Sequence, residues 1–527
     1  MPGASKTLWI FANGLPYNSQ ILKDWPKGQP ILLIESNERA SQLRYHQHKL
    51  VLLFSAMRHF AAWAKDQGYQ VDYHPLDQTE SFEKGWRSHL KRFSPSEVHI
   101  LRPPDYGFLP FLEKIVKDEH IELRTHRNDL FLLDPEEFCR QQAGKRHLLM
   151  ETHYRSMRKR YNILMDKEGG PEGGRWNFDA DNRKGYEKGL SGRQPPIRSD
   201  DPIVREVMKL VQKEFPDNPG DARTFWWPVT REESLLHLQK FIHHELDLFG
   251  PHQDAMAIGQ PFLRHALLSP LLNIGLLHPL ECVEAAEKAY RNGKARLESA
   301  EAFIRQIIGW REFIYGVYWL QMPEVLKQNH LKADRDLPAF FWTGKSGMCC
   351  VDQTVDQTLE WGYAHHIQRL MIVTNFCTLA GIRPEAVLHW FMELFIDAYD
   401  WVMVPNVYGM GLFADGGFFA TKPYVSSGAY VHRMSNYCQS CRYDVKQRTG
   451  PKACPFNFLY WDFMLRHETE FRRNPRMATA LMGLKKLSEE DRHAFQAEAK
   501  RWFAHLDDPH SSHEGRSESP RCQSPPD

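Results

Sequence analysis

The chain has 527 residues, enough for several domains and a large core. Its 67 Lys and Arg are balanced by 66 Asp and Glu, which excludes a polybasic protein, and its 42% hydrophobic and 12% aromatic residues exclude a disordered one. No apolar run is long enough to span a bilayer, and the N-terminus, MPGASKTLWIFANGLP, lacks the features of an export leader. We therefore expect a cytoplasmic protein without membrane contact, whose nine cysteines are not paired in structural disulfides.

The first 133 residues alternate between short apolar runs and helical patterns. Residues 49–66 place apolar side chains at helical spacing between two of these runs. Strands separated by helices predict parallel crossovers, and hence a doubly wound parallel-sheet α/β domain over 1–133. No G-x-G-x-x-G follows the first run, so nothing supports a dinucleotide site there. The predicted strands are 7–14, 30–36, 69–76, 97–103 and the segment around 121–127.

Residues 134–200 are predicted to connect this domain to the next. Between 140 and 160 the chain carries seven Lys or Arg against one acid, Glu151. A solvated helix face and a surface that contacts phosphates both explain such a run of charge. The stretch 167–184 is rich in glycine and is predicted to be a loop.

The pattern over 201–507 is helical and predicts a large all-α C-terminal domain. Its longest periodic segments are 299–320 and 363–381, and no strand-like alternation accompanies them. The last residues, 508–527, are rich in Ser, Pro and charged residues and are predicted to be a disordered tail.

The most informative cysteines form the motif C-Q-S-C at 438–441, followed by Cys454-Pro455. A redox C-x-x-C belongs in a thioredoxin-like unit, which is missing here, and a four-cysteine zinc site usually shows two such pairs. An iron–sulfur cluster tolerates unequal spacing and a Cys-Pro at its last ligand, with the pair Cys349-Cys350 as the distant source of a fourth ligand. From spacing alone, cluster, zinc and structural thiols stay open.

Several further motifs occur together and in order. In these motifs and in its cysteines the chain resembles the iron–sulfur bacterial cryptochromes and (6-4) photolyases, a branch of the photolyase/cryptochrome superfamily, over its whole length to about residue 505. The resemblance implies a photolyase/cryptochrome fold whose helical domain binds FAD, and a [4Fe-4S] cluster held by Cys350, Cys438, Cys441 and Cys454. The motifs are W-N-F-D (176–179), R-Q-I-I-G-W-R-E (305–312), Y-A-H-H-I-Q-R-L-M (363–371), A-D-G-G (414–417) and T-K-P-Y (421–424).

The resemblance implies light-driven repair of a (6-4) lesion that is flipped out of DNA. Splitting this adduct moves a hydroxyl group between bases and therefore needs a proton donor. Histidine is well suited to this role. His366 matches the lesion-facing histidine of the family, and His365 precedes it; both are expected mid-helix. Tyr424 and Tyr430 match tyrosines of the lesion pocket. Without the resemblance, these histidines and tyrosines would be interpreted as packing residues.

The resemblance also implies a set of flavin contacts. Arg369 matches the arginine that pairs with an aspartate near the flavin N5, here Asp397, although an ordinary helix–helix ion pair is the alternative. The segment 265–277 is similar to the phosphate-binding turn of the superfamily, with His265, Leu267 and the hydroxyl of Ser269 facing the cofactor at a helix N-terminus. Trp310 and Arg311 match the W-R pair beside the flavin.

Electron supply and DNA contacts follow from the same resemblance. Trp390 and Trp342 match the aromatic chain that carries electrons to the flavin, while Phe391 stands where a related member has the more easily oxidised Tyr. The expected partner is UV-damaged DNA, bound by a monomer. The residues expected to contact its backbone are Arg155, Arg158, Lys159, Arg183, Lys422 and Arg433.

The α/β domain departs from the family pattern for a ribityl-lumazine antenna. Members that bind this chromophore often have G-D-Q-L after the first strand, where this chain has Ala12-Asn13-Gly14-Leu15. They also have a Glu shortly after the second strand, at the position that Arg39 occupies in this chain. A differently held 6,7-dimethyl-8-ribityllumazine and an empty domain both remain open.

Two other functions compete with a (6-4) photolyase. A blue-light photoreceptor on the same scaffold would signal through a protein partner, and the Ser/Pro-rich tail is its only specific feature. A light-independent iron–sulfur protein that binds nucleic acid would contain no flavin.

Overall fold

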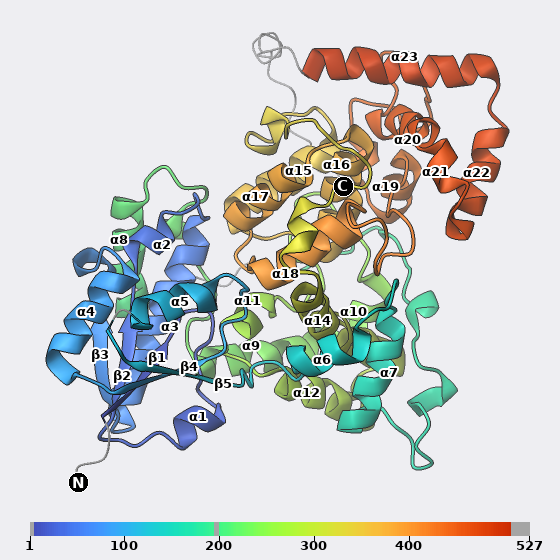
Figure 1. The fold of residues 1–527 in the computed structure, drawn as a ribbon. Coiled ribbons are helices and arrows are strands. Elements are labelled where there is room, and N and C mark those ends of the chain that lie inside the picture. Colours follow the sequence, from blue (N-terminus) through green and yellow to red (C-terminus); the bar gives the residue numbers. More distant parts are fainter. Residues whose placement is uncertain (1–4, 118, 194–199, 507–527) are drawn as a thin grey trace.

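A computed structural model describes residues 5–117, 119–193 and 200–506. A sheet domain and a larger helical domain lie side by side (Figure 1). The tail predicted over 508–527 lies outside the described residues, as do 194–199 of the predicted connector. Within the described residues, no helix is both long and apolar enough to cross a membrane.

All five predicted strands are confirmed and form one parallel sheet. The strand order is β3-β2-β1-β4-β5, with Leu8 opposite Ile31 and Thr7 opposite Val98. The order reverses at β1, so the sheet is doubly wound as predicted. The strands are β1 (Lys6–Ile10), β2 (Pro30–Ile34), β3 (Gln70–His74), β4 (Glu97–Leu101) and β5 (Glu122–His126).

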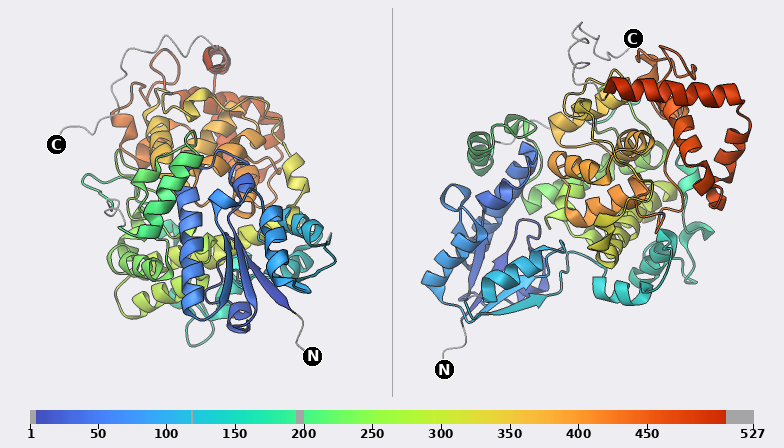
Figure 2. Two further views of the ribbon diagram at one scale, coloured as in Figure 1. Left: turned by 90° about the vertical axis from the view of Figure 1, so that its left-hand side faces the viewer. Right: turned by 45° about the horizontal axis from the view of Figure 1, so that its top comes forward.

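Alternate residues of the central strands enter two different cores. Leu8 and Ile31 point toward α3, in the core that continues into the helical domain, whereas Trp9 and Leu32 pack with α4 and α5. Figure 2 shows helices on both faces of the sheet. The strands are therefore apolar on both sides, which explains their continuous apolar runs. The helices of this domain are α1 (Gln20–Lys23), α2 (Asn37–Ala40), α3 (Gln47–Asp66), α4 (Phe82–Phe93) and α5 (Phe108–Lys117).

The second domain is helical, as predicted, and contains no strand within the described residues 200–506. The segment 299–320 forms α13, a π-helical segment at Arg305–Arg311, and α14. The connector contains two helices, α6 (Pro135–Gln142) and α7 (Met150–Tyr161). The α-helices of the second domain are α8 (Pro202–Glu214), α9 (Arg231–His244), α10 (Leu246–His252), α11 (Ser269–Asn273), α12 (Pro279–Arg291), α13 (Leu297–Ile304), α14 (Glu312–Gln321), α15 (Cys349–Trp361), α16 (Asn375–Ala380), α17 (Pro384–Leu394), α18 (Asp400–Val404), α19 (Gly428–Met434), α20 (Pro455–Arg466), α21 (Glu468–Phe471), α22 (Ala478–Lys485) and α23 (Glu489–Leu506).

Polar contacts join the two domains. The buried Glu312 of α14 accepts hydrogen bonds from the backbone N–H groups of Leu132 and Leu133, both 2.8 Å long. Arg58 of α3 pairs with Glu206 of α8 at 2.8 Å, and α8 packs along α3 although it follows the connector in sequence (Figure 1). The end of the α/β domain is thus fixed to the helix that carries Trp310 and Arg311.

A buried polar network crosses the sheet domain. Thr7 Oγ1 and His89 Nε2 are 2.8 Å apart, and His89 Nδ1 lies 2.7 Å from Asp72 Oδ2. Asp72 also contacts His74 and Arg92. Burial alone would raise the pKa of Asp72, but the hydrogen bonds from His74 and His89 outweigh it and hold this pKa below the ordinary 3.8. Burial lowers the pKa of His89. The fold therefore favours a charged Asp72 and a neutral His89 in this network.

We expect Asp72→Asn to destabilise the protein by about 1–3 kcal/mol, because it leaves buried donors without their charged acceptor. Both folded-state pKa values lie below the unfolded ones, so this stability is complete near pH 7 and is lost as the pH falls, first through His89 and then through Asp72. Urea unfolding at pH 7 and pH 5 measures this. Glu83→Gln, which breaks the exposed pair of Glu83 with Arg87, is the control; an equal loss in both variants would contradict the network's importance.

Candidate functional site

The predicted pair of Arg369 and Asp397 forms at the centre of the helical domain. Arg369 Nη1 and Nη2 lie 2.9 and 3.1 Å from the two carboxylate oxygens of Asp397, a bidentate arrangement that is strong and directional. Ser269, at the start of α11, donates its hydroxyl to Asp397 Oδ2 at 2.6 Å. This hydroxyl is therefore engaged by a carboxylate, whereas we predicted that it would meet a phosphate. Arg369 lies in a π-helical segment, Gln368–Thr374, a feature frequent at functional sites.

The prediction that both histidines lie mid-helix is wrong. Gly362 ends α15 with a φ of 65°, the left-handed conformation that favours glycine, and Tyr363, Ala364 and His365 are not helical. The helix starts at His366, and the side chain of Gln368 accepts a hydrogen bond from the backbone N–H of His365 at 3.1 Å. His366 therefore stands at a helix end, where its ring is freer than inside a helix.

The three histidines near Arg369 have different surroundings. His365 is buried, stacks on His265 at 4.2 Å between ring centroids, and has no hydrogen-bond partner on either ring nitrogen. His366 is exposed, yet desolvation lowers its pKa to about 4, with Arg369 and His265 adding to the shift. From this combination of an accessible and a desolvated ring we infer that His366 lines a concave surface, called the hollow below. The unpartnered nitrogens of His365 are available to a ligand there.

The predicted tyrosines belong to a second group of residues. Tyr430 lies under Arg433, whose guanidinium carbon is 5.4 Å from the ring centroid. Arg183 pairs with Asp179 at 2.6 Å, and both Arg183 and the nearby carboxylate Asp254 influence the pKa of Tyr430. Burial, and then the charge of Asp179, raise the pKa of Asp254 to about 6. Tyr424 is half-buried and lies within electrostatic range of Asp179.

Sequence reasoning missed Asp179 and Asp254 as site residues. Asp179 is the last residue of the W-N-F-D motif, which was the available signal, whereas nothing in the sequence marks Asp254. The segment that contains Asp254 joins the two groups, because the carbonyl of Gln253 lies 3.0 Å from His265 Nε2. A Cβ added at Gly185 would come within 2.2 Å of the carbonyl oxygen of Arg433, so the Arg183 segment also packs closely on α19.

The remaining predicted flavin residues are divided between two places. His265 and Leu267 belong to the turn that leads into α11, where Leu267 has a φ of 57°, a strained conformation for this residue type. Arg311 is not brought to the Arg369–Asp397 pair. It lies 2.6 Å from Glu312 and stacks on Phe131 at 4.3 Å, at the junction with the sheet domain, while Trp310 packs on Phe313.

Five of the six cations predicted to contact DNA are exposed. Arg158 is the exception: it is fully buried and donates to the backbone carbonyls of Ile163, Leu164 and Trp176. The prediction of a DNA contact for Arg158 is corrected to a structural role, because α7 turns Tyr154, Met157 and Arg158 inward together. Arg155 and Lys159, which flank Trp176, are exposed, as are Arg183, Lys422 and Arg433.

The four predicted cluster ligands gather near one another from separate elements. Cys350 lies on α15, Cys438 lies within the short helical turn Tyr437–Gln439, Cys441 follows this turn, and Cys454 immediately precedes α20. Burial raises the pKa of Cys438 and Cys454 to about 12, and neighbouring thiols add to both shifts. Burial and the other three thiols likewise raise the pKa of Cys350. In the described residues no three Cys, His, Asp or Glu side chains converge closely enough to hold a single metal ion.

A cavity of about 130 Å³ lies between the sheet domain and the helical domain. Three of the positions that depart from the antenna pattern line it, namely Ala12, Asn13 and Arg39. Asp105 and Asp400, which the sequence did not reveal, line it as well. Asp105 Oδ1 is buried without a hydrogen-bond partner, and burial, then Asp400, raise the pKa of Asp105 to about 7. A mostly apolar lining with a few polar groups is typical of small-molecule sites.

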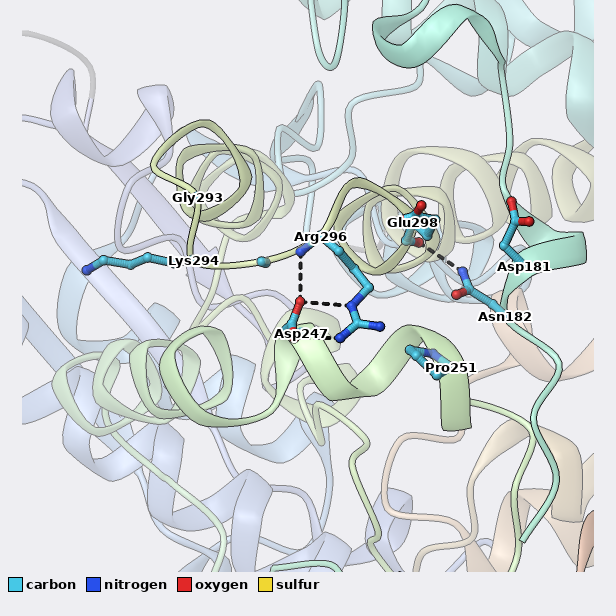
Figure 3. A pocket seen from close by; sticks show the side chains of 9 residues that line it. Asp181, Asn182, Asp247, Pro251, Gly293, Lys294, Arg296 and Glu298 are labelled. Atoms are coloured by element: carbon cyan, nitrogen blue, oxygen red, sulfur yellow. Dashed lines mark hydrogen bonds and ion pairs between the residues drawn. The ribbon is translucent and has the colours of Figure 1, made fainter. Parts of the chain in front are cut away.

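A polar depression lies between α10 and the start of α13 (Figure 3). Asp247 accepts hydrogen bonds from Arg296, at 2.8 Å from its backbone N–H and 2.9 Å from Nη2. Asn182 Nδ2 donates to the carbonyl of Glu298 at 2.9 Å. Because Asp247 and Arg296 satisfy each other, we assign no ligand to this depression.

The predicted electron carriers Trp390 and Trp342 both lie next to Phe341, Trp390 by ring contact and Trp342 in sequence. Trp390 is buried and donates to the carbonyl of Phe341 at 2.9 Å, while Trp342 is half-exposed beneath Arg44. Phe391 contacts the ring of Trp390 at 5.5 Å.

The sequence of the chain is similar to those of known proteins. The model of the family described as deoxyribodipyrimidine photo-lyase-related protein matches residues 8–227. The chain is 43% identical over 484 residues to a protein named (6-4) photolyase from Agrobacterium fabrum, covering 91% of this chain and 95% of that one. It is 25% identical over 218 residues to a (6-4)DNA photolyase of Arabidopsis thaliana, covering 38% and 37% of the two chains.

Two solved structures share the fold at low sequence identity. A bacterial class III photolyase from Agrobacterium tumefaciens superposes with a TM-score of 0.53 and 17% identity, covering 95% of this chain and 98% of that one. A cryptochrome from Synechocystis superposes with a TM-score of 0.55 and 15% identity, covering 82% and 88%. The chain thus has the photolyase/cryptochrome fold.

Proposed function

Because this chain belongs to the same family as the Agrobacterium (6-4) photolyase, we propose that it repairs (6-4) pyrimidine–pyrimidone photoproducts in DNA with the energy of light. The observation that carries the proposal is the placement of an accessible His366 beside the bidentate Arg369–Asp397 pair. This arrangement offers a proton donor and a fixed cation in one hollow. We expect the protein to act in the cytoplasm as a monomer on UV-damaged DNA.

The hollow fits a flavin through groups that the protein leaves unsatisfied. His365 has two unpartnered ring nitrogens, and the Asp397 carboxylate holds the guanidinium of Arg369 in a fixed position nearby. Arg369, Asp397, His265 and Leu267 would hold FAD, and Trp310 would border it. FAD in its reduced form would supply, on excitation by light, the electron that splits the lesion. The fixed charge of Arg369 would stabilise an anionic ring without reorganisation of solvent.

The other groups would hold DNA and transfer a proton. Tyr424 and Tyr430 would contact the flipped lesion, and His366 would donate the proton that accompanies transfer of the hydroxyl group. Arg155, Lys159, Arg183, Lys422 and Arg433 would bind phosphates, a contribution that weakens as salt rises. Asp254 and Asp179 would orient Arg183 at the mouth of the hollow.

We propose that Cys350, Cys438, Cys441 and Cys454 hold a [4Fe-4S] cluster. Each ligand of such a cluster binds a different iron, so the four sulfurs surround a volume instead of converging on one ion. Burial and mutual repulsion oppose thiolate formation here, and a cationic iron centre would reverse this effect.

The cavity between the domains is our proposed site for a 6,7-dimethyl-8-ribityllumazine antenna. Although Arg39 stands where an acid was expected, the unpartnered Oδ1 of Asp105 can accept a hydrogen bond from the ribityl chain or the ring. Asp105 and Asp400 would thus replace the missing glutamate from another part of the chain.

The test is an anaerobic preparation of the full chain, illuminated with DNA that contains one (6-4) photoproduct. We expect flavin absorption, a broad iron–sulfur shoulder, and restored thymines only under light. Undamaged DNA and darkness are the controls. Tight lesion binding and complete flavin reduction without repair would overturn the proposal in favour of a photoreceptor, and a preparation without flavin bands would favour a light-independent DNA-binding protein.

A further inference from the structure

An exposed leucine immediately precedes α7. Leu149 is 57% exposed, and no large apolar side chain in the described part of the chain is more exposed. The backbone beside it is held in place: the N–H of Leu148 donates to the carbonyl of Phe418 at 2.8 Å, and His147 Nδ1 lies 3.0 Å from the carbonyl oxygen of Gly417. A fixed segment therefore presents this leucine to solvent.

A leucine is poorly suited to the position that Leu149 occupies in the helix. It is the N-cap of α7, with the extended backbone of a cap (φ −120°, ψ 116°), and its side chain makes no capping hydrogen bond. Ser, Thr, Asp and Asn are preferred at an N-cap, because their side-chain oxygens accept a hydrogen bond from the first turn. The side chain of Leu149 thus contributes neither a cap nor much buried area to the fold.

Two segments of the candidate site contact the chain on either side of this leucine. After it, Glu151 accepts a hydrogen bond from the side chain of Asn177 at 3.1 Å, and Asn177 lies two residues before Asp179. Before it, the backbone bond to Phe418 joins the chain to the segment that leads to Tyr424. The leucine therefore lies at the edge between two segments that would hold the lesion.

The sequence around Leu149 is basic. Lys145 and Arg146 precede it and are exposed, and Arg155 and Lys159 are exposed on α7. Such cations bind DNA phosphates and position a protein on the duplex without reading its sequence. An apolar side chain flanked by phosphate-binding cations meets the apolar part of DNA, which is the stack of bases between the two backbones.

We propose that Leu149 is an apolar wedge that enters the base stack of duplex DNA at the damaged site, an inference that rests on the proposed repair of a flipped lesion. A lesion that leaves the duplex leaves a gap in the stack, and apolar side chains inserted between base steps stabilise such distorted DNA. The leucine would fill this gap while the neighbouring cations hold the backbone. A single strand has no gap between paired bases, so the wedge would matter only for duplex DNA.

Leu149→Ser tests this role, because serine removes the apolar side chain and supplies the missing cap. We expect its affinity for duplex DNA with one (6-4) photoproduct to fall about tenfold, and its affinity for a single strand with the same lesion to stay within about twofold of the parent. The melting temperature should equal or slightly exceed that of the parent, since serine is the better N-cap. Leu149→Met, which keeps an apolar side chain of similar size, should bind both DNAs as the parent does.

Met482→Ser is the matched control, because Met482 is an equally exposed apolar residue on α22. Parent-like duplex binding by Leu149→Ser, an equal loss on duplex and single strand, or the same loss in Met482→Ser would overturn the wedge and leave the photolyase proposal intact. A parent protein that does not prefer lesion DNA to undamaged DNA would overturn both. If Leu149→Ser does not fold, Leu149→Ala decides by the same binding measurements.

Discussion

His366→Ala is expected to lower light-driven repair of (6-4) photoproducts by about 10²–10⁴-fold, the usual contribution of a positioned acid or base. The ring of His366 is accessible in the hollow beside Arg369, whereas His365 is buried against His265. Removing it should leave flavin content and lesion affinity nearly unchanged, because Arg369 and Asp397 keep their bidentate contact. Single-turnover repair, with absorption and lesion binding measured on the same sample, checks this.

The matched control is His389→Ala, which removes an exposed histidine of α17. A His366→Ala protein that repairs at the parent rate would refute the acid role. Equal loss of repair in His389→Ala would instead indicate a general effect on the helical domain.

The pH dependence of repair should reveal the form in which His366 acts. Desolvation lowers its pKa to about 4, so the ring is neutral at pH 7 in the protein without ligands. Bound DNA phosphates and an anionic flavin would raise this pKa, since nearby negative charge favours the imidazolium. If the imidazolium is the donor, the repair rate falls as the pH rises through the raised pKa. The same fall should be missing in His366→Asn; an identical pH profile in this variant would assign the titration to another group.

The strands were predictable because burial on both faces requires continuous apolar runs. Residues 30–34 are all buried, and the sequence there is simply PILLI. The helix at 363–381 was less predictable at its start than in its middle. Apolar spacing continues through His365, but the left-handed Gly362 and the hydrogen bond from the His365 backbone to Gln368 delay the helix by three residues. This delayed start depends on the direction of the Gln368 side chain, which the spacing of apolar residues does not reveal.

The charged run at 155–160 shows a signal that was present but unused. Tyr154, Met157 and Arg158 lie on one face of a helix, and two of the three are apolar, so helical spacing marks this face as inward. Other parts of the site leave no local trace. Asp254 and Asp105 become important only because long-range packing buries them near other carboxylates, and no pattern around either residue predicts it.

The π-helical segment that carries Arg369 was also beyond prediction. The residues Gln368–Thr374 have the same apolar spacing as an ordinary helix. Each π-type hydrogen bond spans one more residue than an α-helical bond. This wider spacing is tolerated where a tertiary contact stabilises it, here the contact of Arg369 with Asp397 from a different part of the chain.

Cys438→Ala is expected to give insoluble or unfolded protein, because the cysteines hold the last part of the chain on the helical core. A chain of contacts leads from them to the candidate site. Tyr437, which precedes Cys438, receives a hydrogen bond on its hydroxyl from Gln368 Nε2 at 3.1 Å, and Gln368 Oε1 accepts from the backbone N–H of His365. Loss of one ligand would thus release Tyr437, Gln368 and the start of the helix that carries His366.

Soluble yield, iron content and flavin content of Cys438→Ala measure this effect. Cys282→Ala is the control, since Cys282 is a buried cysteine of α12 that does not belong to the group. A soluble Cys438→Ala protein that binds flavin and repairs lesions would contradict a structural role for the cluster. Gln368→Leu separates the two consequences of the mutation. It keeps all four thiols, so iron should be retained, while the fixed position of His365 and His366 is lost and repair should fall without loss of solubility.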